Sequence, residues 1–204
     1  MTSYEIYGTR TGNCLRVTIG LEELGETYSA KHVDLMMREH LTPRFRALNP
    51  VGRVPVLLER MKGEVAFVLA QSSAILLHLD QNHPGSLLPE RSYMRSRATE
   101  RFMYFVTDVA APGQLSFHLR RPNLIHGGLY LERLSVQRIE FSEIFLSESQ
   151  FMGGDTFSIA DIAAFTSISE MAEEVDWTTK PNLLKWYRGM RNRPSIIKGM
   201  RAFD

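Results

Sequence analysis

The sequence lacks a disulfide partner, a membrane-spanning stretch and a recognisable leader, and each absence excludes a class of protein. The one cysteine, Cys14, cannot form an internal disulfide, so nothing indicates an oxidising compartment. The longest apolar runs, such as Val65–Ala70, are far shorter than the roughly 18 residues that a membrane-spanning helix needs. The opening residues, MTSYEIYGTR, carry Glu5 and no apolar core, which argues against a secretory signal. We therefore expect a cytoplasmic protein.

An excess of either charge is also missing. The 24 lysines and arginines face 23 aspartates and glutamates, which gives a formal net charge of +1. The balance is local as well, with nine basic and nine acidic residues up to Asn82. Proteins that bind nucleic acid usually show a basic excess or stripe. We therefore expect no nucleic-acid partner and no membrane, but small molecules or protein partners.

Most motifs of known active sites are absent. The sequence has no G-x-S-x-G, no Walker loop, no dinucleotide-binding glycine pattern and no C-x-x-C. Its six histidines form no pair spaced by four residues, the arrangement that metalloenzymes place on a helix. We therefore expect no metal.

The hydrophobic pattern changes after a turn cluster at His83–Ser86. Before it we predict short elements: strands at Tyr4–Tyr7, Tyr28–Val33, Val54–Leu58 and Glu64–Leu69, with helices at Cys14–Leu24, Leu41–Leu48 and Gln71–Gln81. After it we predict long helices: Arg91–Leu119, interrupted near Pro112, then Leu129–Ser149, Ser158–Val175 and Asn182–Asn192. The predicted fold class is thus α/β plus all-α, with an α/β domain at 1–82, a linker at 83–90 and an all-helical domain at 91–204.

Two predicted helix starts in the first domain carry polar side chains. Thr11–Cys14 brings a hydroxyl, an amide and a thiol to the first helix, and Gln71-Ser72 begins another helix directly after a strand. Unpaired N–H groups and the helix dipole favour an anion at such a place. The first start is therefore suited to a thiolate and the second to a carboxylate. Taken singly, each is explained as well by Asn13 and Ser72 serving only as N-caps.

The predicted helix from Ser158 has the residues of a complete N-terminal cap. Ser158 and Asp161 occupy the two positions of a capping box, and Phe157 and Ile162 those of a hydrophobic staple. We expect this device to stabilise the fold and assign it no catalytic role.

The segment between the two polar helix starts points to a family. NPVGRVPVLLE, Asn49–Glu59, places Val54-Pro55 at a strand entry, where a cis peptide suits a tight turn and would expose the Val54 backbone to a peptide-like ligand. Together with AQSSAILLHLDQ and FSIADI, it closely resembles the cytosolic glutathione S-transferases. The resemblance covers nearly the whole chain. It implies a thioredoxin-like first domain, a C-terminal helical-bundle domain, glutathione as co-substrate, and a homodimer.

The resemblance also implies roles for individual residues. Gln71 and Ser72 would hold the γ-glutamyl end of glutathione, and the Val54 backbone would pair with its cysteinyl part. Arg53 matches a position near the tripeptide, and His40 resembles a histidine that theta-like members use toward the glycyl carboxylate. For Arg53 and His40, a solvated surface charge is the equal alternative.

The activating group would come from the first helix start. RTGNCLRV resembles both the RSSCSWRV pattern of zeta-like members and the TPNGHKI pattern of nu-like members, and both alignments place Thr11 where the activating hydroxyl belongs, with Asn13 two residues on. Thr11 and Asn13 are therefore the predicted catalytic residues. Cys14 is the rival, although it continues the apolar stripe of Val17 and Leu21 as a core cysteine would.

The resemblance implies an enzyme that activates glutathione as a thiolate and transfers it to a small electrophile, bound against the first long helix near Tyr104 and Asp108. Two alternatives stay open. One is a glutathione-dependent disulfide-bond oxidoreductase, as in nu-like members. The other is a non-catalytic ligand-binding or regulatory member, because fold alone does not imply activity.

Overall fold

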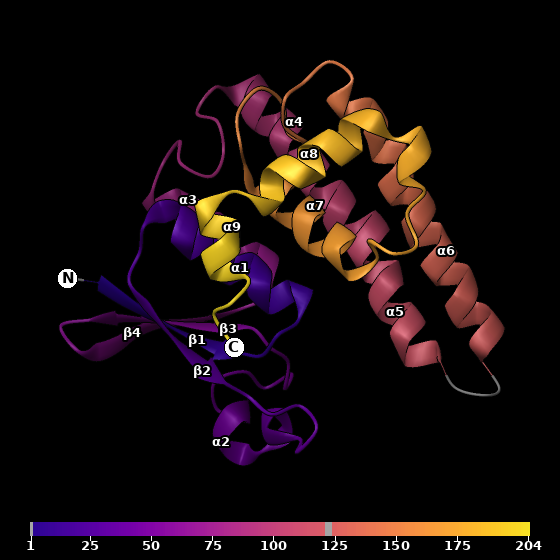
Figure 1. The fold of residues 1–204 in the computed structure, drawn as a ribbon. Coiled ribbons are helices and arrows are strands. Elements are labelled where there is room, and N and C mark those ends of the chain that lie inside the picture. Colours follow the sequence, from indigo (N-terminus) through magenta and orange to yellow (C-terminus); the bar gives the residue numbers. More distant parts are fainter. Residues whose placement is uncertain (1, 121–123) are drawn as a thin grey trace. The chain divides into compact units, whose positions relative to one another are not determined.

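The computed structural model describes residues 2–120 and 124–204, which form two compact units (Figure 1). The first unit extends to Leu87 and also includes Asn192–Asp204, and the second is Leu88–Arg191. Within the described residues, no helix has the length and apolar character needed to cross a bilayer.

A four-stranded mixed sheet forms the centre of the first unit. Its strands are β1 (Thr2–Gly8), β2 (Tyr28–His32), β3 (Val56–Met61) and β4 (Glu64–Ala70), in the order β2-β1-β3-β4. Strands β1 and β2 are parallel, and the other two pairs are antiparallel. The helices of this unit are α1 (Gly12–Leu24), the short 3₁₀ helix η1 (Glu39–Leu41), α2 (Pro43–Arg46), α3 (Ser72–Asn82) and α9 (Pro194–Gly199).

Both faces of this sheet are covered. Side chains alternate between the faces along a strand, yet Val56, Leu57 and Leu58 are all buried. Val56 and Leu58 pack with Val33 and Phe45, and Phe45 belongs to α2. Figure 1 shows α2 on one side of the sheet and α1, α3 and α9 on the other. The predicted α/β domain followed by a helical domain is confirmed.

The ends of α1 follow its sequence. Gly25 adopts the left-handed conformation at φ 68° and closes the helix, as the sequence predicts. Helix α9 was not predicted, because its six residues are too short for a periodic pattern. It packs along α1, and the Thr18 hydroxyl donates a hydrogen bond to the Gly199 carbonyl at 2.8 Å. The packing therefore groups residues 192–204 with the first unit, whereas the sequence places them with the helical domain.

The contact between α1 and α9 is very close at Gly199. A Cβ atom added there would lie 2.7 Å from both the backbone nitrogen and Cα of Ile19, and backbone cannot move aside as a side chain can. We expect Gly199→Ala to lower the free energy of unfolding by about 2–3 kcal/mol or more, as overpacking does. Urea denaturation measures this.

Gly189 provides the matched control for that substitution. It also lies in a helix, α8 (Pro181–Arg191), but an added Cβ would meet nothing within 4 Å. Gly189→Ala should leave the protein equally stable or stabilise it by up to about 1 kcal/mol, because alanine favours helix. Equal effects of the two substitutions would contradict the close packing at Gly199.

The second unit consists of helices. They are α4 (Ser92–Met103), the π-helical segment η2 (Tyr104–Ala110), α5 (Ala111–Leu119), α6 (Ile125–Phe141), the 3₁₀ helix η3 (Ser142–Leu146), α7 (Ile159–Glu170), the 3₁₀ helix η4 (Trp177–Thr179) and α8. The interruption predicted at Pro112 is present as η2, the turn that precedes the proline. Pro112 has no N–H to donate to the carbonyl four residues earlier, and a π-helical turn accommodates that loss.

Two helices are shorter than their sequences predict. Helix α6 tightens to 3₁₀ geometry after Phe141, whereas the apolar stripe predicts a helix to Ser149. Ile144, which lies within the predicted helix, is 59% exposed. Helix α7 ends at Glu170 rather than Val175.

The predicted cap of α7 is confirmed. The Ser158 hydroxyl accepts from the Ala160 N–H, and the Asp161 carboxylate accepts from the Ser158 N–H at 3.0 Å. Asp161 is fully buried, and its other oxygen accepts from the Met152 N–H and the Trp186 indole N–H, each at 2.9 Å. Burial raises the pKa of this carboxyl to about 6.

Candidate functional site

The start of α1 places Thr11 where the chain enters the helix. Thr11 is the N-cap, in extended conformation, and its carbonyl accepts from the N–H groups of Cys14 and Leu15 at 2.9 Å. Its side chain makes no capping bond. Instead, Thr11 Oγ1 donates to Cys14 Sγ at 3.2 Å. A thiol is a weak acceptor, so this hydroxyl can turn to a stronger one.

The other two candidates at this helix start, Asn13 and Cys14, differ in their place in the structure. Asn13 is the second residue of α1 rather than its N-cap, so the alternative that it only caps the helix is wrong. Cys14 is completely buried, and a Cβ on Gly8 would lie only 2.8 Å from its Sγ. The structure thus places Cys14 in the core, as its apolar stripe indicates.

The start of α3 has an unusual backbone. Gln71 is the N-cap at φ 74° and ψ 111°, a conformation that residues other than glycine rarely adopt. Its side chain is exposed and makes no capping bond, while Ser72, the first helical residue, is buried. Ser72 is therefore not a plain N-cap either. Strained backbone of this kind concentrates at functional sites.

A buried arginine that sequence reasoning did not single out joins the two starts. Arg16 Nη1 donates to Asn13 Oδ1 at 3.1 Å and to Ser72 Oγ at 3.3 Å. Asn13 and Ser72 are thereby brought together, although 58 positions separate them in the sequence. Arg16 is part of the RTGNCLRV pattern, where it only helps to match the chain to the patterns of zeta-like and nu-like members. Nothing in that pattern signals that it reaches α3.

The loop before β3 is ordered by an asparagine. Asn49 Nδ2 donates to the Arg53 carbonyl at 2.7 Å, and Asn49 Oδ1 accepts from the Val51 N–H at 3.2 Å. The bond between Val54 and Pro55 is cis, as expected at this strand entry. Val54 is partly buried against the α2 side of the sheet, and Arg53 is exposed.

His40 lies in η1, next to the same loop. A Cβ on Gly52, which has φ 65°, would lie 2.9 Å from the His40 carbonyl, so the loop and η1 are in close contact. His40 Nδ1 is a buried nitrogen without a hydrogen-bond partner among the described residues. A buried polar atom in that state calls for a partner, which a ligand can supply.

The two candidates in the second unit lie on η2. Tyr104 is half-buried, and its hydroxyl donates to the Arg138 carbonyl at 2.7 Å. Burial raises the pKa of the Tyr104 phenol to about 12, so it stays protonated at neutral pH. Asp108 is exposed and accepts from the Thr107 hydroxyl at 3.0 Å.

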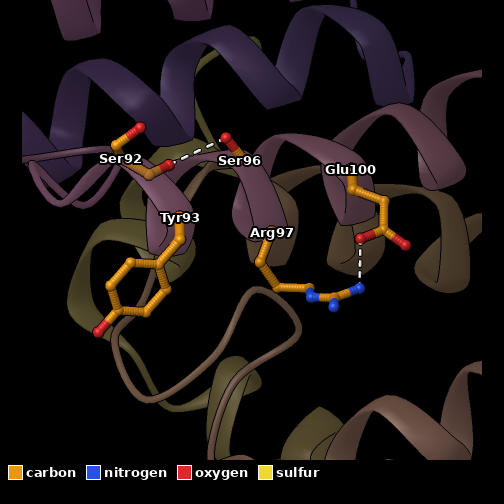
Figure 2. Close-up of a pocket in the computed structure, with 5 residues that line it drawn as sticks. All are labelled: Ser92, Tyr93, Ser96, Arg97 and Glu100. Carbon is orange, nitrogen blue, oxygen red and sulfur yellow. Dashed lines mark hydrogen bonds and ion pairs between the residues drawn. The ribbon is translucent and has the colours of Figure 1, made fainter.

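An open hollow of about 620 Å³ lies elsewhere on the second unit, on the surface of α4. Figure 2 shows the five side chains that line it: Ser92, Tyr93, Ser96, Arg97 and Glu100. Arg97 and Glu100 are paired with one another, and the Ser96 hydroxyl donates to the Ser92 carbonyl. None of the predicted site residues lines this hollow. Over residues 2–120 and 124–204, no three or more metal-ligating side chains gather.

Comparison with known proteins gives consistent matches over both units. The family model "Glutathione S-transferase, N-terminal domain" matches residues 6–87, and "Glutathione S-transferase, C-terminal domain" matches residues 130–198. The chain is similar to the disulfide-bond oxidoreductase YfcG of Escherichia coli, with 26% identity over 94% of this chain and 91% of that protein. It is also 26% identical to protein URE2 of Candida glabrata, over 99% of this chain and 68% of that protein.

Among solved structures, one similar protein is a glutathione transferase from Burkholderia graminis. The TM-score is 0.85 at 26% identity, over 97% of this chain and 87% of that one. That protein was crystallised with two glutathione molecules bound to each subunit.

Proposed function

Since the chain belongs to the glutathione S-transferase family, we propose that it binds glutathione in the first unit, activates the thiol as a thiolate and transfers it to a small electrophile. Glutathione is the co-substrate and no metal takes part. A cytoplasmic location and a homodimer belong to the same proposal, and the mass of the protein in solution tests the second.

The observation that carries the proposal is the contact of one arginine, Arg16, with the starts of both α1 and α3. One nitrogen, Arg16 Nη1, contacts both Asn13 Oδ1 and Ser72 Oγ, so these two oxygens are no more than about 6.4 Å apart. A tripeptide spans up to roughly 10 Å. A single molecule of glutathione is therefore long enough to place its thiol at the start of α1 and its γ-glutamyl group at the start of α3.

The residues at α1 are chemically suited to ionise the thiol. An ordinary thiol pKa of about 8.5 leaves only about 3% thiolate at pH 7, and a drop of about 2 units gives roughly three quarters. Such a drop requires about 2.7 kcal/mol. A hydrogen bond from the Thr11 hydroxyl, roughly 1.5–3 kcal/mol, and the N-terminus of α1, about 0.3–1 kcal/mol, supply that amount. Asn13 adds a second donor.

We assign the remaining candidates to successive parts of the peptide. Gln71 and Ser72 hold the γ-glutamyl end, and the Val54 backbone pairs with the cysteinyl part. His40, whose Nδ1 has no hydrogen-bond partner among the described residues, faces the glycyl carboxylate, and the exposed Arg53 lies near the tripeptide. The Tyr104 hydroxyl already donates to the Arg138 carbonyl, so Tyr104 offers its ring rather than its hydroxyl to the electrophile. Asp108 offers a polar side chain to it.

The backbone strain at Gln71 gives a test of the binding site. Gln71→Gly should stabilise the protein by about 1 kcal/mol, since glycine adopts φ 74° without the penalty that other residues bear. It should also weaken glutathione binding at least tenfold through loss of the side chain, about 1.4 kcal/mol. Thermal unfolding and calorimetric titration measure the two effects.

Lys62 is the matched control, because it also has a positive φ, 52°, but lies in the turn between β3 and β4. Lys62→Gly should gain comparable stability and bind glutathione as the parent does. Unchanged binding in Gln71→Gly would remove Gln71 from the site.

The experiment that tests the proposed function is a glutathione titration followed by ultraviolet difference absorption. The expected result is saturable binding with a thiolate band at neutral pH, followed by turnover of small electrophiles. No binding at millimolar glutathione would overturn the proposal.

The likeness to YfcG, a disulfide-bond oxidoreductase, favours one second candidate. In that function the bound glutathione thiolate attacks a disulfide sulfur, one thiol leaves, and a second glutathione resolves the mixed disulfide. Parallel assays with an aryl halide and with a small disulfide separate the two functions. Turnover of the disulfide alone would favour the oxidoreductase, and glutathione binding without either turnover would indicate a non-catalytic member.

A further inference from the structure

Arg16 combines two properties that rarely occur together. Its side chain is only 2% exposed, and it lies on the second turn of α1 with Nη1 directed at two uncharged side chains, Asn13 and Ser72. Charged side chains are seldom fully buried unless they are paired or hydrogen-bonded, because removing a charge from water is costly. What the contacts of Arg16 with Asn13 and Ser72 achieve follows from the hydrogen-bonding capacity of a guanidinium.

A guanidinium only donates hydrogen bonds, and this fixes the direction of both contacts. The Asn13 atom that lies 3.1 Å from Arg16 must be the carbonyl oxygen, so the amide Nδ2 with its two N–H groups is directed the other way. In the second contact, Ser72 Oγ is the acceptor, so the hydroxyl hydrogen is left to donate elsewhere. Arg16 thereby determines the donor direction of both side chains.

We infer that Arg16 is a positioning residue that turns Asn13 and Ser72 into hydrogen-bond donors for the anionic groups of one ligand molecule. The inference rests on the proposed function in taking glutathione as that ligand. Asn13 then donates to the thiolate, and Ser72 donates to the γ-glutamyl carboxylate. Arg16 itself stays behind both residues, and its charge favours the anionic form of whatever they hold.

The first test replaces Arg16 by lysine and by methionine and measures the pH dependence of the ultraviolet thiolate band of bound glutathione. Arg16→Lys keeps the charge but loses the planar fork, and it should raise the apparent thiol pKa by about one unit, a tenfold change in the ionisation constant. Arg16→Met should weaken glutathione binding by about a further tenfold, since both donors lose their orientation. Arg60→Met, which removes a cation paired with Glu5 on β1, is the control and should change neither.

A double-mutant cycle separates positioning from a general role in packing. If Arg16 acts through Asn13, Arg16→Lys should have little further effect on the thiol pKa once Asn13 is alanine. Equal shifts with and without Asn13 would overturn the inference. Circular dichroism and the unfolding midpoint confirm that each variant is folded, and Arg16→Lys alone completes the cycle if Arg16→Met does not fold.

A measurement without ligand keeps this inference separate from the proposed function. In the ligand-free protein, the side-chain amide of Asn13 should give one ordered pair of NMR resonances, which Arg16→Lys broadens or averages. An amide equally ordered in both proteins would overturn the positioning role. Failure of the parent protein to bind glutathione would overturn the proposed function and would leave the amide result intact.

Discussion

Replacing Thr11 by valine will slow glutathione transfer by about 10- to 100-fold and change glutathione binding little. Valine keeps the shape of threonine but has no hydroxyl, and a hydrogen bond to a charged group is worth roughly 1.5–3 kcal/mol. The Thr11 hydroxyl stabilises the thiolate more than the thiol. Its loss therefore raises the thiol pKa and lowers kcat. Steady-state kinetics with an electrophile, and the pH dependence of the thiolate band, measure both.

Two control variants make that result specific. Thr11→Ser retains a hydroxyl at the N-cap of α1 and should keep most of the activity. Cys14→Ala removes the buried thiol that accepts from Thr11 and should leave the rate within a few-fold of the parent, because that thiol faces the core. If Thr11→Val is fully active while Cys14→Ala or Cys14→Ser is inactive, the catalytic assignment is wrong and the cysteine is the activating group.

Replacing Asp161 by alanine will lower the free energy of unfolding by about 3–5 kcal/mol, a large part of the stability of an ordinary domain. Four donors lose their acceptor: the N–H groups of Met152 and Ser158, the Ser158 hydroxyl and the indole N–H of Trp186. Each buried donor left unpaired costs about 1–3 kcal/mol. Urea denaturation gives the number. Asp155→Ala, in the exposed loop before α7, is the control and should change stability by less than about 0.5 kcal/mol.

The same carboxyl should leave a signature in the pH dependence of stability. Its pKa rises from 3.8 to about 6 on folding, because burial disfavours the charged form. The native state therefore binds the proton more tightly than the unfolded state, and stability falls as the pH rises from about 4 to about 6. Asp161→Asn cannot titrate, so the advantage of the parent over this variant should shrink by about 3 kcal/mol across that window. Parallel stability curves for the two proteins would contradict the raised pKa.

The elements that the sequence predicted well are those whose signals are local. Strands such as Glu64–Ala70 alternate or carry continuous apolar runs, and Gly25 and Ser158 mark a helix end and a helix start by their own conformational preferences. The cis bond at Val54-Pro55 was expected for the same reason, since proline restricts the chain wherever it stands.

The elements that it missed depend on contacts between distant residues. Helix α9 is short and contacts Thr18 and Ile19 of α1; Thr18 and its partner Gly199 are 181 positions apart. The missing N–H of Pro112 predicts an interruption of the long helix, but not that the interruption takes π-helical form over Tyr104–Ala110.

The candidate site shows the same contrast between local sequence signals and contacts of distant residues. Thr11, Asn13, Gln71 and Ser72 are proposed as site residues because polar residues at helix starts are visible in sequence, and the structure places them at the starts of α1 and α3. The arginine that connects them was not predicted, because position 16 reads as an ordinary surface charge on an amphipathic helix until α3 is packed beside it. Arg16 therefore needs to be tested together with the side chains that are proposed to contact glutathione.

Helix α9 is synthesised after the second unit but packs in the first, and this determines when the first unit can complete its fold. A ribosome releases the sheet, α1 and α3 early, but the helix that covers Ile19 emerges only after the whole of the second unit. The first unit is thus begun first and completed last. A fragment cut at Leu87 would lack a part of its own core, and supplying residues 192–204, joined to it or added as a separate peptide, would be needed to restore its structure.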